Sequence, residues 1–184
     1  MTKSWQEFIF EMENAKYDFS SVQFNLPQKE RDKVLEWSEE NVPDEVLHDP
    51  PDENKGREDE PHVTVLYGLH DPDPAPVKDF LKRDRPFEIV LGKLSLFDTN
   101  EKFDVLKIDV EGKKLHNINR RLRGNFKHWT SYPKYIPHVT IAYLKKGKGE
   151  EWAGDDVFEG MKIDVNTLLF SSTKKTKTPI PLNG

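Results

Sequence analysis

A short phrase occurs twice in the sequence, and its residue types suit proton transfer at a phosphate. The first copy reads Pro-His-Val-Thr-Val-Leu-Tyr over residues 61–67, and the second reads Pro-His-Val-Thr-Ile-Ala-Tyr over residues 137–143. A histidine moves protons near neutral pH, and a threonine hydroxyl can donate a hydrogen bond to a phosphate oxygen. One such pair in a strand is commonly structural, but two copies with the same flanking proline and tyrosine indicate a shared function.

Each copy is typical of a buried strand, because it is rich in β-branched and aromatic residues and follows a proline. Side chains two residues apart lie on the same face of a strand. His62 and Thr64 therefore share one face, as do His138 and Thr140. Each strand presents an imidazole and a hydroxyl roughly 6.5–7 Å apart along the backbone. These four residues are the candidate catalytic set.

The composition limits the possible classes of protein. A chain of 184 residues with 35% hydrophobic and 11% aromatic residues can build the core of a single domain. Its net charge of −5 argues against binding to duplex nucleic acid, which requires many cationic side chains. A small anionic ligand remains compatible with this charge, since it needs only a local positive pocket.

Cysteine is absent, which excludes disulfides, thiolate catalysis and structural zinc of the cysteine type. No apolar run approaches the length of a membrane span, and the N-terminus lacks the apolar core of a signal peptide. We therefore expect a cytoplasmic protein without membrane contacts, and the sequence leaves its oligomeric state open.

Local patterns predict the elements that position the two motifs. Gln23 and Asn25 share one face of the first predicted strand, and they face either a site or water. Gly92 suggests a bulge or a bend in a later strand. Strands are expected over residues 19–26, 87–97 and 103–110, helices over 28–41, 77–82 and 113–126, a strand pair or a short helix and a strand over 157–163 and 165–170, and an edge strand in the tail before Pro179.

Three further stretches allow two interpretations each. An amphipathic helix over Ser4–Lys16, within an N-terminal extension over residues 1–18, packs on the main body or forms a partner surface. Residues 43–60 form an acidic, proline-rich loop that is either solvated or a lid, with Lys55 and Arg57 as its phosphate contacts. The arginine group at 120, 121 and 123 is more typical of a solvated helix face than of a site.

An aromatic loop over residues 128–135 leads into the second motif. Its aromatic side chains and its lysine suit a loop that stacks a base while tolerating phosphate. The alternative is a loop that packs its aromatic side chains as a small separate core. The candidate substrate-binding residues are Trp129, Tyr132 and Lys134 of this loop, with Tyr67 and Tyr143, which end the two motifs.

The order of elements predicts an α+β fold built by duplication, with two antiparallel sheets facing a central groove and helices outside. We expect residues 1–184 to form one domain with two pseudo-symmetric lobes.

The paired Pro-His-Val-Thr strands, 76 residues apart, resemble the 2H phosphoesterase superfamily, which includes the 2′-5′ RNA ligase-like phosphoesterases and cyclic phosphodiesterases. The resemblance covers about Phe19 to Phe170. It implies a bilobal fold with both His-x-Thr pairs in a central cleft, and phosphodiester chemistry that needs no metal and no cofactor. Small phage enzymes that hydrolyse cyclic di- and trinucleotide signals, and so evade cyclic-oligonucleotide immunity, share this plan. The motifs alone do not select that subclass.

Splitting a P–O bond needs a base for the attacking hydroxyl or water and an acid for the leaving oxygen. Two histidines can serve, and Thr64 and Thr140 can stabilise the charge on the phosphate oxygens. Pseudo-symmetry leaves the two roles open, and the family analogy favours His138 as base and His62 as acid. We expect a phosphoric diester hydrolase whose substrate is a nucleotide or cyclic oligonucleotide. The alternatives are a binding module that sequesters a nucleotide and a ligase-like activity on RNA ends, which the low positive charge disfavours.

Overall fold

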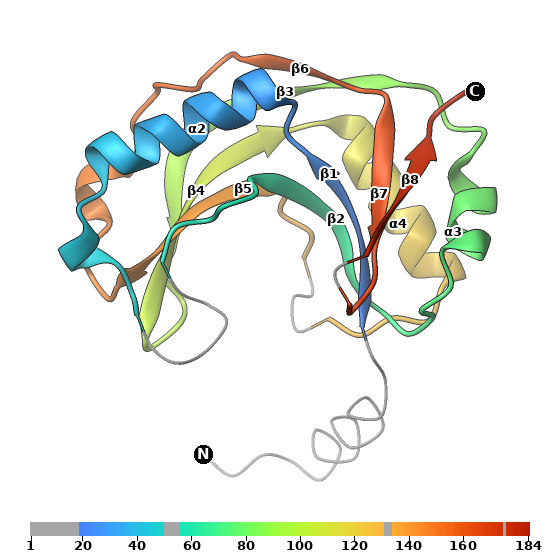
Figure 1. Cartoon of the computed structure of the whole chain (residues 1–184), viewed down its shortest axis with the longest axis horizontal. Coiled ribbons are helices and arrows are strands. Elements are labelled where there is room, and N and C mark those ends of the chain that lie inside the picture. Colours follow the sequence, from blue (N-terminus) through green and yellow to red (C-terminus); the bar gives the residue numbers. More distant parts are fainter. Residues whose placement is uncertain (1–18, 50–55, 131–133, 175) are drawn as a thin grey trace, which may run out of the picture.

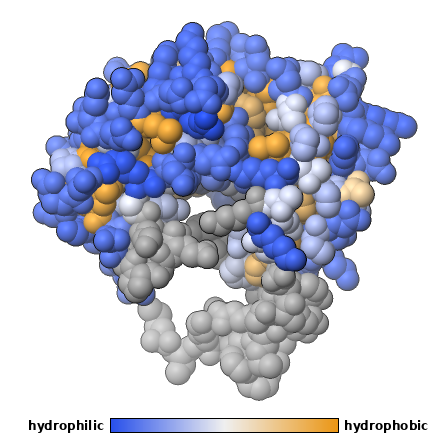
Figure 2. Space-filling model, in the orientation of Figure 1, coloured by the Kyte–Doolittle hydropathy of each residue, from blue (hydrophilic) through white to orange (hydrophobic). Residues whose placement is uncertain are grey.

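The computed structural model describes residues 19–49, 56–130, 134–174 and 176–184. The helix predicted over residues 4–16 lies outside these ranges, as do Lys55 and Tyr132. Among the described residues, no helix is long and apolar enough to cross a membrane. Figure 2 shows hydrophilic residues over most of one face, with small hydrophobic patches between them.

In the described part of the chain, one curved sheet of eight strands runs in the order β6-β3-β4-β5-β2-β1-β7-β8 (Figure 1). All of its strand pairs are antiparallel. The strands are β1 (Ser20–Asn25), β2 (His62–Leu69), β3 (Phe87–Phe97), β4 (Phe103–Glu111), β5 (His138–Lys145), β6 (Lys162–Val165), β7 (Thr167–Ser171) and β8 (Lys177–Pro181).

The two predicted sheets are the two halves of this sheet, β6-β3-β4-β5 and β2-β1-β7-β8. Within the described part of the chain, the ladder between the halves consists of one residue pair, Val63 opposite Val139. The predicted bend at Gly92 is confirmed, because the β3–β4 register shifts between Leu91 and Leu94. The halves, called lobes below, therefore meet at the two motif strands.

The helices lie on the convex side of the sheet, and each of two helices crosses to the opposite half (Figure 1). α2 (Gln28–Asn41) follows β1 but packs on β5, and α4 (Lys113–Asn125) follows β4 but packs on β2. The apolar residues of α4 recur at helical spacing, so they form one buried stripe. Its buried apolar residues are Leu115, Ile118 and Leu122.

The structure corrects three predicted boundaries. α3 spans Pro74–Leu81 rather than 77–82, because Asp73 accepts a hydrogen bond from the Ala75 amide at 2.9 Å and proline suits a first helical turn. Residues 157–160 form turns, and β6 begins only at Lys162. The tail strand runs through Pro179 instead of ending before it, because β8 is an edge strand where proline is tolerated.

The described flanks of the acidic loop run alongside β5. The His48 amide donates to the Tyr143 carbonyl, and the Tyr143 amide donates to the Gly56 carbonyl, each at 2.9 Å. Arg57 donates to the Ser38 carbonyl at 3.3 Å and pairs with Asp44. Arg57 therefore ties the loop to its surroundings, and its role as a phosphate contact stays a prediction.

Candidate active site

The two motif strands are neighbours at the centre of the sheet, and they run antiparallel with Val63 opposite Val139. In an antiparallel pair this register brings His62 next to Thr140 and His138 next to Thr64. Both valines have no exposed surface, whereas the four polar side chains are partly exposed on the other face. The predicted alternation is thus observed, and each histidine lies beside the threonine of the other copy.

The two imidazoles are held in the same way. Nδ1 of His62 lies 2.8 Å from the Glu60 carbonyl oxygen, and Nδ1 of His138 lies 2.7 Å from the Ile136 carbonyl oxygen. A carbonyl oxygen only accepts hydrogen bonds, so each Nδ1 carries a hydrogen. Nε2 is therefore the nitrogen of each ring that can exchange a proton with a substrate.

Strand β1 lines the site in the first lobe. Gln23 lies opposite Thr64, and Asn25 lies opposite His62. The Gln23 side-chain amide donates to the Asn25 side-chain oxygen at 2.7 Å, and Asn25 donates in turn to Glu60. Gln23 and Asn25 were predicted to face either a site or water, and their register with β2 places them on the face of the motif residues. The side chains supplied by β1 here are neutral amides.

Strand β4 supplies the equivalent residues in the second lobe, and these are charged. Lys107 lies opposite Thr140, and Asp109 lies opposite His138. The Lys107 ammonium donates to Asp109 and, at 2.6 Å, to Ser95, although only 4% of Lys107 is exposed. Burial raises the pKa of Asp109, but the hydrogen bonds from Lys107 and Ser95 outweigh it and hold the pKa below its usual value.

The surroundings of His138 favour its neutral form. Burial lowers its pKa, and the charges of Lys107 and His62 lower it further, against the opposing effects of the Ile136 carbonyl and Asp109. The edge of the Phe97 ring meets His138 at a centroid distance of 4.8 Å. His138 therefore lies against an aromatic ring and near a buried cation.

Carboxylates gather on the His62 side instead. A hydrogen bond from Lys177 holds the pKa of Glu60 below its usual value, although burial acts against it. Burial raises the pKa of Glu58, which accepts a hydrogen bond from the Glu60 amide at 3.1 Å. Both carboxylates interact electrostatically with His62. A lysine–carboxylate pair thus lies near each histidine, Glu60–Lys177 near His62 and Asp109–Lys107 near His138, and of the two lysines only Lys107 is buried.

The sequence profile of the 2′-5′ RNA ligase superfamily matches residues 48–168, which is more than half of the chain. The chain belongs to the 2′-5′ RNA ligase superfamily. This assignment places it among the 2H phosphoesterases, as the paired motifs predicted. It also supports an enzyme with phosphodiesterase-type or ligase-type chemistry.

Solved structures share the fold at low sequence identity. The protein TT0787 of Thermus thermophilus is 17% identical with a TM-score of 0.57, and the match covers 90% of this chain and 100% of that one. LigT of E. coli, solved with 3′-AMP, is 14% identical with a TM-score of 0.57, covering 91% and 96%. The predicted fold class is confirmed. No curated protein matches the chain significantly.

In this 2′-5′ RNA ligase superfamily member, a bulge re-aims the tyrosine that ends each motif. Strict alternation would place Tyr67 and Tyr143 on the face opposite the motif histidines. The β1–β2 ladder skips Val65 and the β4–β5 ladder skips Ile141, and each extra residue reverses the alternation. Tyr67 is 51% exposed as a result. Both predicted tyrosines thus share a face with the catalytic candidates.

Of the other predicted substrate contacts, the structure describes Trp129 and Lys134. Trp129 stacks on Phe19 with ring centroids 5.6 Å apart, and Phe19 also meets Tyr67 at 6.1 Å. Gly68 has a φ of +88°, and a Cβ there would lie 1.6 Å from the Trp129 carbonyl oxygen, so only glycine allows this approach. Trp129 therefore belongs to a small aromatic cluster at the end of β2. Lys134 lines a pocket with residues of α4 rather than with the motif residues.

Proposed function

We propose that this protein is a metal-independent phosphodiesterase that hydrolyses a cyclic nucleotide phosphodiester, either a 2′,3′-cyclic phosphate or a cyclic di- or trinucleotide. The reciprocal register of the motif strands carries this proposal. A phosphate seated over the Val63–Val139 pair would have an imidazole and a hydroxyl from each strand around it. Crystal structures of LigT with 3′-AMP, ATP and NADP⁺ support a nucleotide as the ligand.

We assign the proton-transfer roles from the buried Lys107 near His138 and the carboxylates near His62. His138, whose surroundings favour the neutral ring, takes a proton on Nε2 from the attacking water while the water oxygen forms a bond to phosphorus. His62, beside the carboxylates of Glu58 and Glu60, gives its Nε2 proton to the ribose oxygen as the P–O bond breaks. His138 ends the step protonated and His62 neutral, and proton exchange with solvent restores both rings.

The threonines stabilise the developing charge. Thr64 and Thr140 donate their hydroxyl hydrogens to the non-bridging phosphate oxygens, on which negative charge grows in the transition state. A buried ammonium at Lys107 next to Thr140 adds a positive potential on the same side. These residues supply charge stabilisation and proton transfer without a metal ion.

A substrate panel tests the proposal. The full chain is incubated in EDTA with 2′,3′-cyclic mononucleotides and with cyclic di- and trinucleotides, and the products are resolved by chromatography and mass spectrometry. We expect a linear phosphomonoester product from at least one member. The double variant His62→Ala with His138→Ala, purified in the same way, is the control for activity from contaminating enzymes.

Three outcomes would contradict the proposal. Binding of every substrate without turnover would favour the nucleotide-sequestering module. Turnover that EDTA abolishes and a divalent ion restores would require a metal-dependent mechanism. Joining of RNA ends without hydrolysis would identify a ligase.

A further inference from the structure

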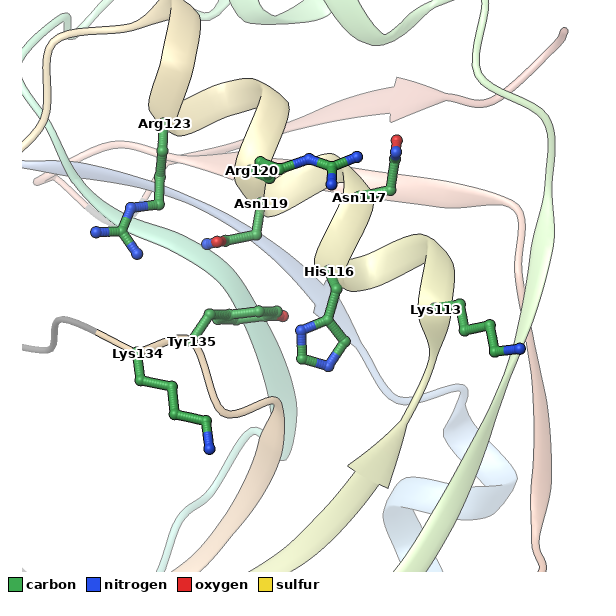
Figure 3. A pocket seen from close by; sticks show the side chains of 8 residues that line it. All are labelled: Lys113, His116, Asn117, Asn119, Arg120, Arg123, Lys134 and Tyr135. Carbon is green, nitrogen blue, oxygen red and sulfur yellow. The ribbon is translucent and has the colours of Figure 1, made fainter.

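A second concave surface lies on α4, apart from the motif residues. It is a pocket of about 560 Å³ between one face of α4 and the segment that enters β5 (Figure 3). Figure 3 shows the flat Tyr135 ring between the side chains of His116 and Arg123, with Lys134 beside it. Its cationic and aromatic lining consists of Lys113, His116, Arg120, Arg123, Lys134 and Tyr135.

The pocket concentrates positive charge in a chain whose net charge is −5. It is lined by four lysine or arginine residues, and no aspartate or glutamate lines it among the described residues. The adjacent face of α4 is different, because the buried Asp84 pairs with Lys114 at 2.6 Å and with Arg121 at 2.8 Å. The sequence indicated that the three arginines of this helix form a solvated face. Instead, Arg121 forms an ion pair with the buried Asp84, whereas Arg120 and Arg123 line the pocket.

The cations are spread along the helix rather than gathered at one point. Lys113, His116, Arg120 and Arg123 recur at i, i+3, i+7 and i+10, so they share one face. This stretch of helix is roughly 15 Å long. One phosphate cannot contact an array of that length, whereas successive phosphates of a flexible chain can.

Two aromatic rings also line this pocket. The rings of Tyr135 and His116 meet at right-angled geometry, with centroids 5.2 Å apart and an interplanar angle of 73°. Burial raises the pKa of Tyr135, so the phenol stays neutral and donates a hydrogen bond to the Thr64 carbonyl at 3.0 Å. Cationic side chains that follow a backbone, together with rings that accept a base, are the features of a single-stranded nucleic acid site.

We propose that this pocket binds the phosphate backbone of a single-stranded oligonucleotide, as a site separate from the catalytic residues. The proposal shares with the proposed function only the nucleotide class of ligand. The pocket lies on α4, on the helix side of β2, whereas the motif residues lie on the other face. Tyr135 connects the two, since it holds the Thr64 carbonyl and the next residue, Ile136, holds His138.

Fluorescence anisotropy with a labelled single-stranded RNA hexanucleotide tests this site. The full chain carries His62→Ala and His138→Ala, so that the probe is not cut. We expect Arg120→Glu with Lys134→Glu to weaken binding by on the order of tenfold, and to reduce the slope of log affinity against log salt by roughly 0.7 for each lost phosphate contact. The charge reversals could disturb folding, so a milder variant, Arg120→Gln with Lys134→Gln, serves as a second test. It should also weaken binding, by a smaller factor.

The matched control is Lys29→Glu with Lys33→Glu. Both lysines are exposed on α2, and the pair changes the net charge by the same amount. An equal loss of affinity in this control would show non-specific attraction and overturn the proposal. Unchanged affinity in the pocket variants would also overturn it, as would a labelled mononucleotide that binds as tightly as the hexanucleotide. Because binding is measured without turnover, a failure of the proposed hydrolysis leaves this result interpretable.

Discussion

Lys107 lies directly across the β4–β5 ladder from Thr140. The residue at the equivalent position of the other lobe is Gln23, which lies across from Thr64. The backbone of the site repeats almost symmetrically, but its charge does not. A buried ammonium next to one histidine and a neutral amide next to the other make the two rings chemically different.

Substitutions at Lys107 and Asp109 should move the pH–rate profile in opposite directions. Lys107 lowers the pKa of His138 and Asp109 raises it. The base must be neutral, so Lys107→Gln should raise this pKa and shift the acidic limb of kcat/KM to higher pH, whereas Asp109→Asn should shift it to lower pH. Lys93→Gln, which removes an exposed lysine from the same lobe, is the control. Shifts of the same sign would reject the assignment of His138 as base.

Each motif histidine should contribute on the scale of a general acid or base. His62→Ala and His138→Ala are each expected to lower turnover by about 10²–10⁴-fold. The double variant should lose less than the product of the two, because both rings act on one phosphate. The pH–rate profile of the wild type should be bell-shaped, and its two apparent pKa values should belong to the coupled pair of histidines rather than to either residue.

His128 is a matched control for these variants, because its Nδ1 also lies near the carbonyl two residues earlier, Phe126, at 3.0 Å. His128→Ala should leave turnover nearly unchanged. Full turnover after removal of either motif histidine would disprove the two-histidine mechanism.

Tyr67 and Trp129, which both contact Phe19, should have separable effects. Tyr67→Ala removes an exposed ring on the site face, so it should weaken nucleotide binding by about 1–3 kcal/mol and leave the melting temperature unchanged. Trp129→Ala removes the ring that stacks on Phe19, so it should lower the melting temperature. Calorimetric binding and thermal unfolding distinguish them, and the reverse pattern would make Trp129 the stacking residue.

Asp84 should make stability depend on pH in the acidic range. Burial raises its pKa, but the hydrogen bonds from Arg121 and Lys114 outweigh burial, so the folded-state pKa lies below the unfolded value. This contribution is therefore complete above about pH 4 and is lost as the pH falls through the folded-state pKa.

Asp84→Asn should cost about 1.5–3 kcal/mol at pH 7 and flatten the acid limb of the stability curve, as measured by urea unfolding. Asp79→Asn, at an exposed position on α3, should change little. An acid limb that is as steep as that of the wild type would show that Asp84 does not produce it.

The local pattern was sufficient for the motif strands and for two helices. Val63 and Val139 alternate with the polar motif residues, α2 begins after Pro27, and α4 follows apolar spacing, so each could be read from neighbours in the sequence. The residues that lie opposite the motifs on neighbouring strands could not be predicted, because the register between strands depends on residues that are distant in the sequence. Lys107 and Asp109 share a face in the predicted strand, but nothing local pairs them with Thr140 and His138.

The bulge that reverses the alternation of side chains in each motif strand could not be predicted from the sequence either. Tyr67 and Tyr143 are each at an odd spacing from their histidine, so alternation alone assigns them to the wrong face. The bulged residues, Val65 and Ile141, are ordinary strand formers and carry no glycine signal. The repeat itself was the available clue, since both copies keep the same spacing.

The crossing of α2 and α4 limits how such a chain can be divided. Each helix packs on the motif strand of the other lobe, so each motif strand is covered by a helix from the opposite half. A chain that held one lobe alone could cover its motif strand in this way only with a helix from a second copy of itself. In that two-chain assembly the two histidines of one site would come from two molecules. The two copies would be identical, so only after fusion into one chain could one lobe have Lys107 where the other has Gln23.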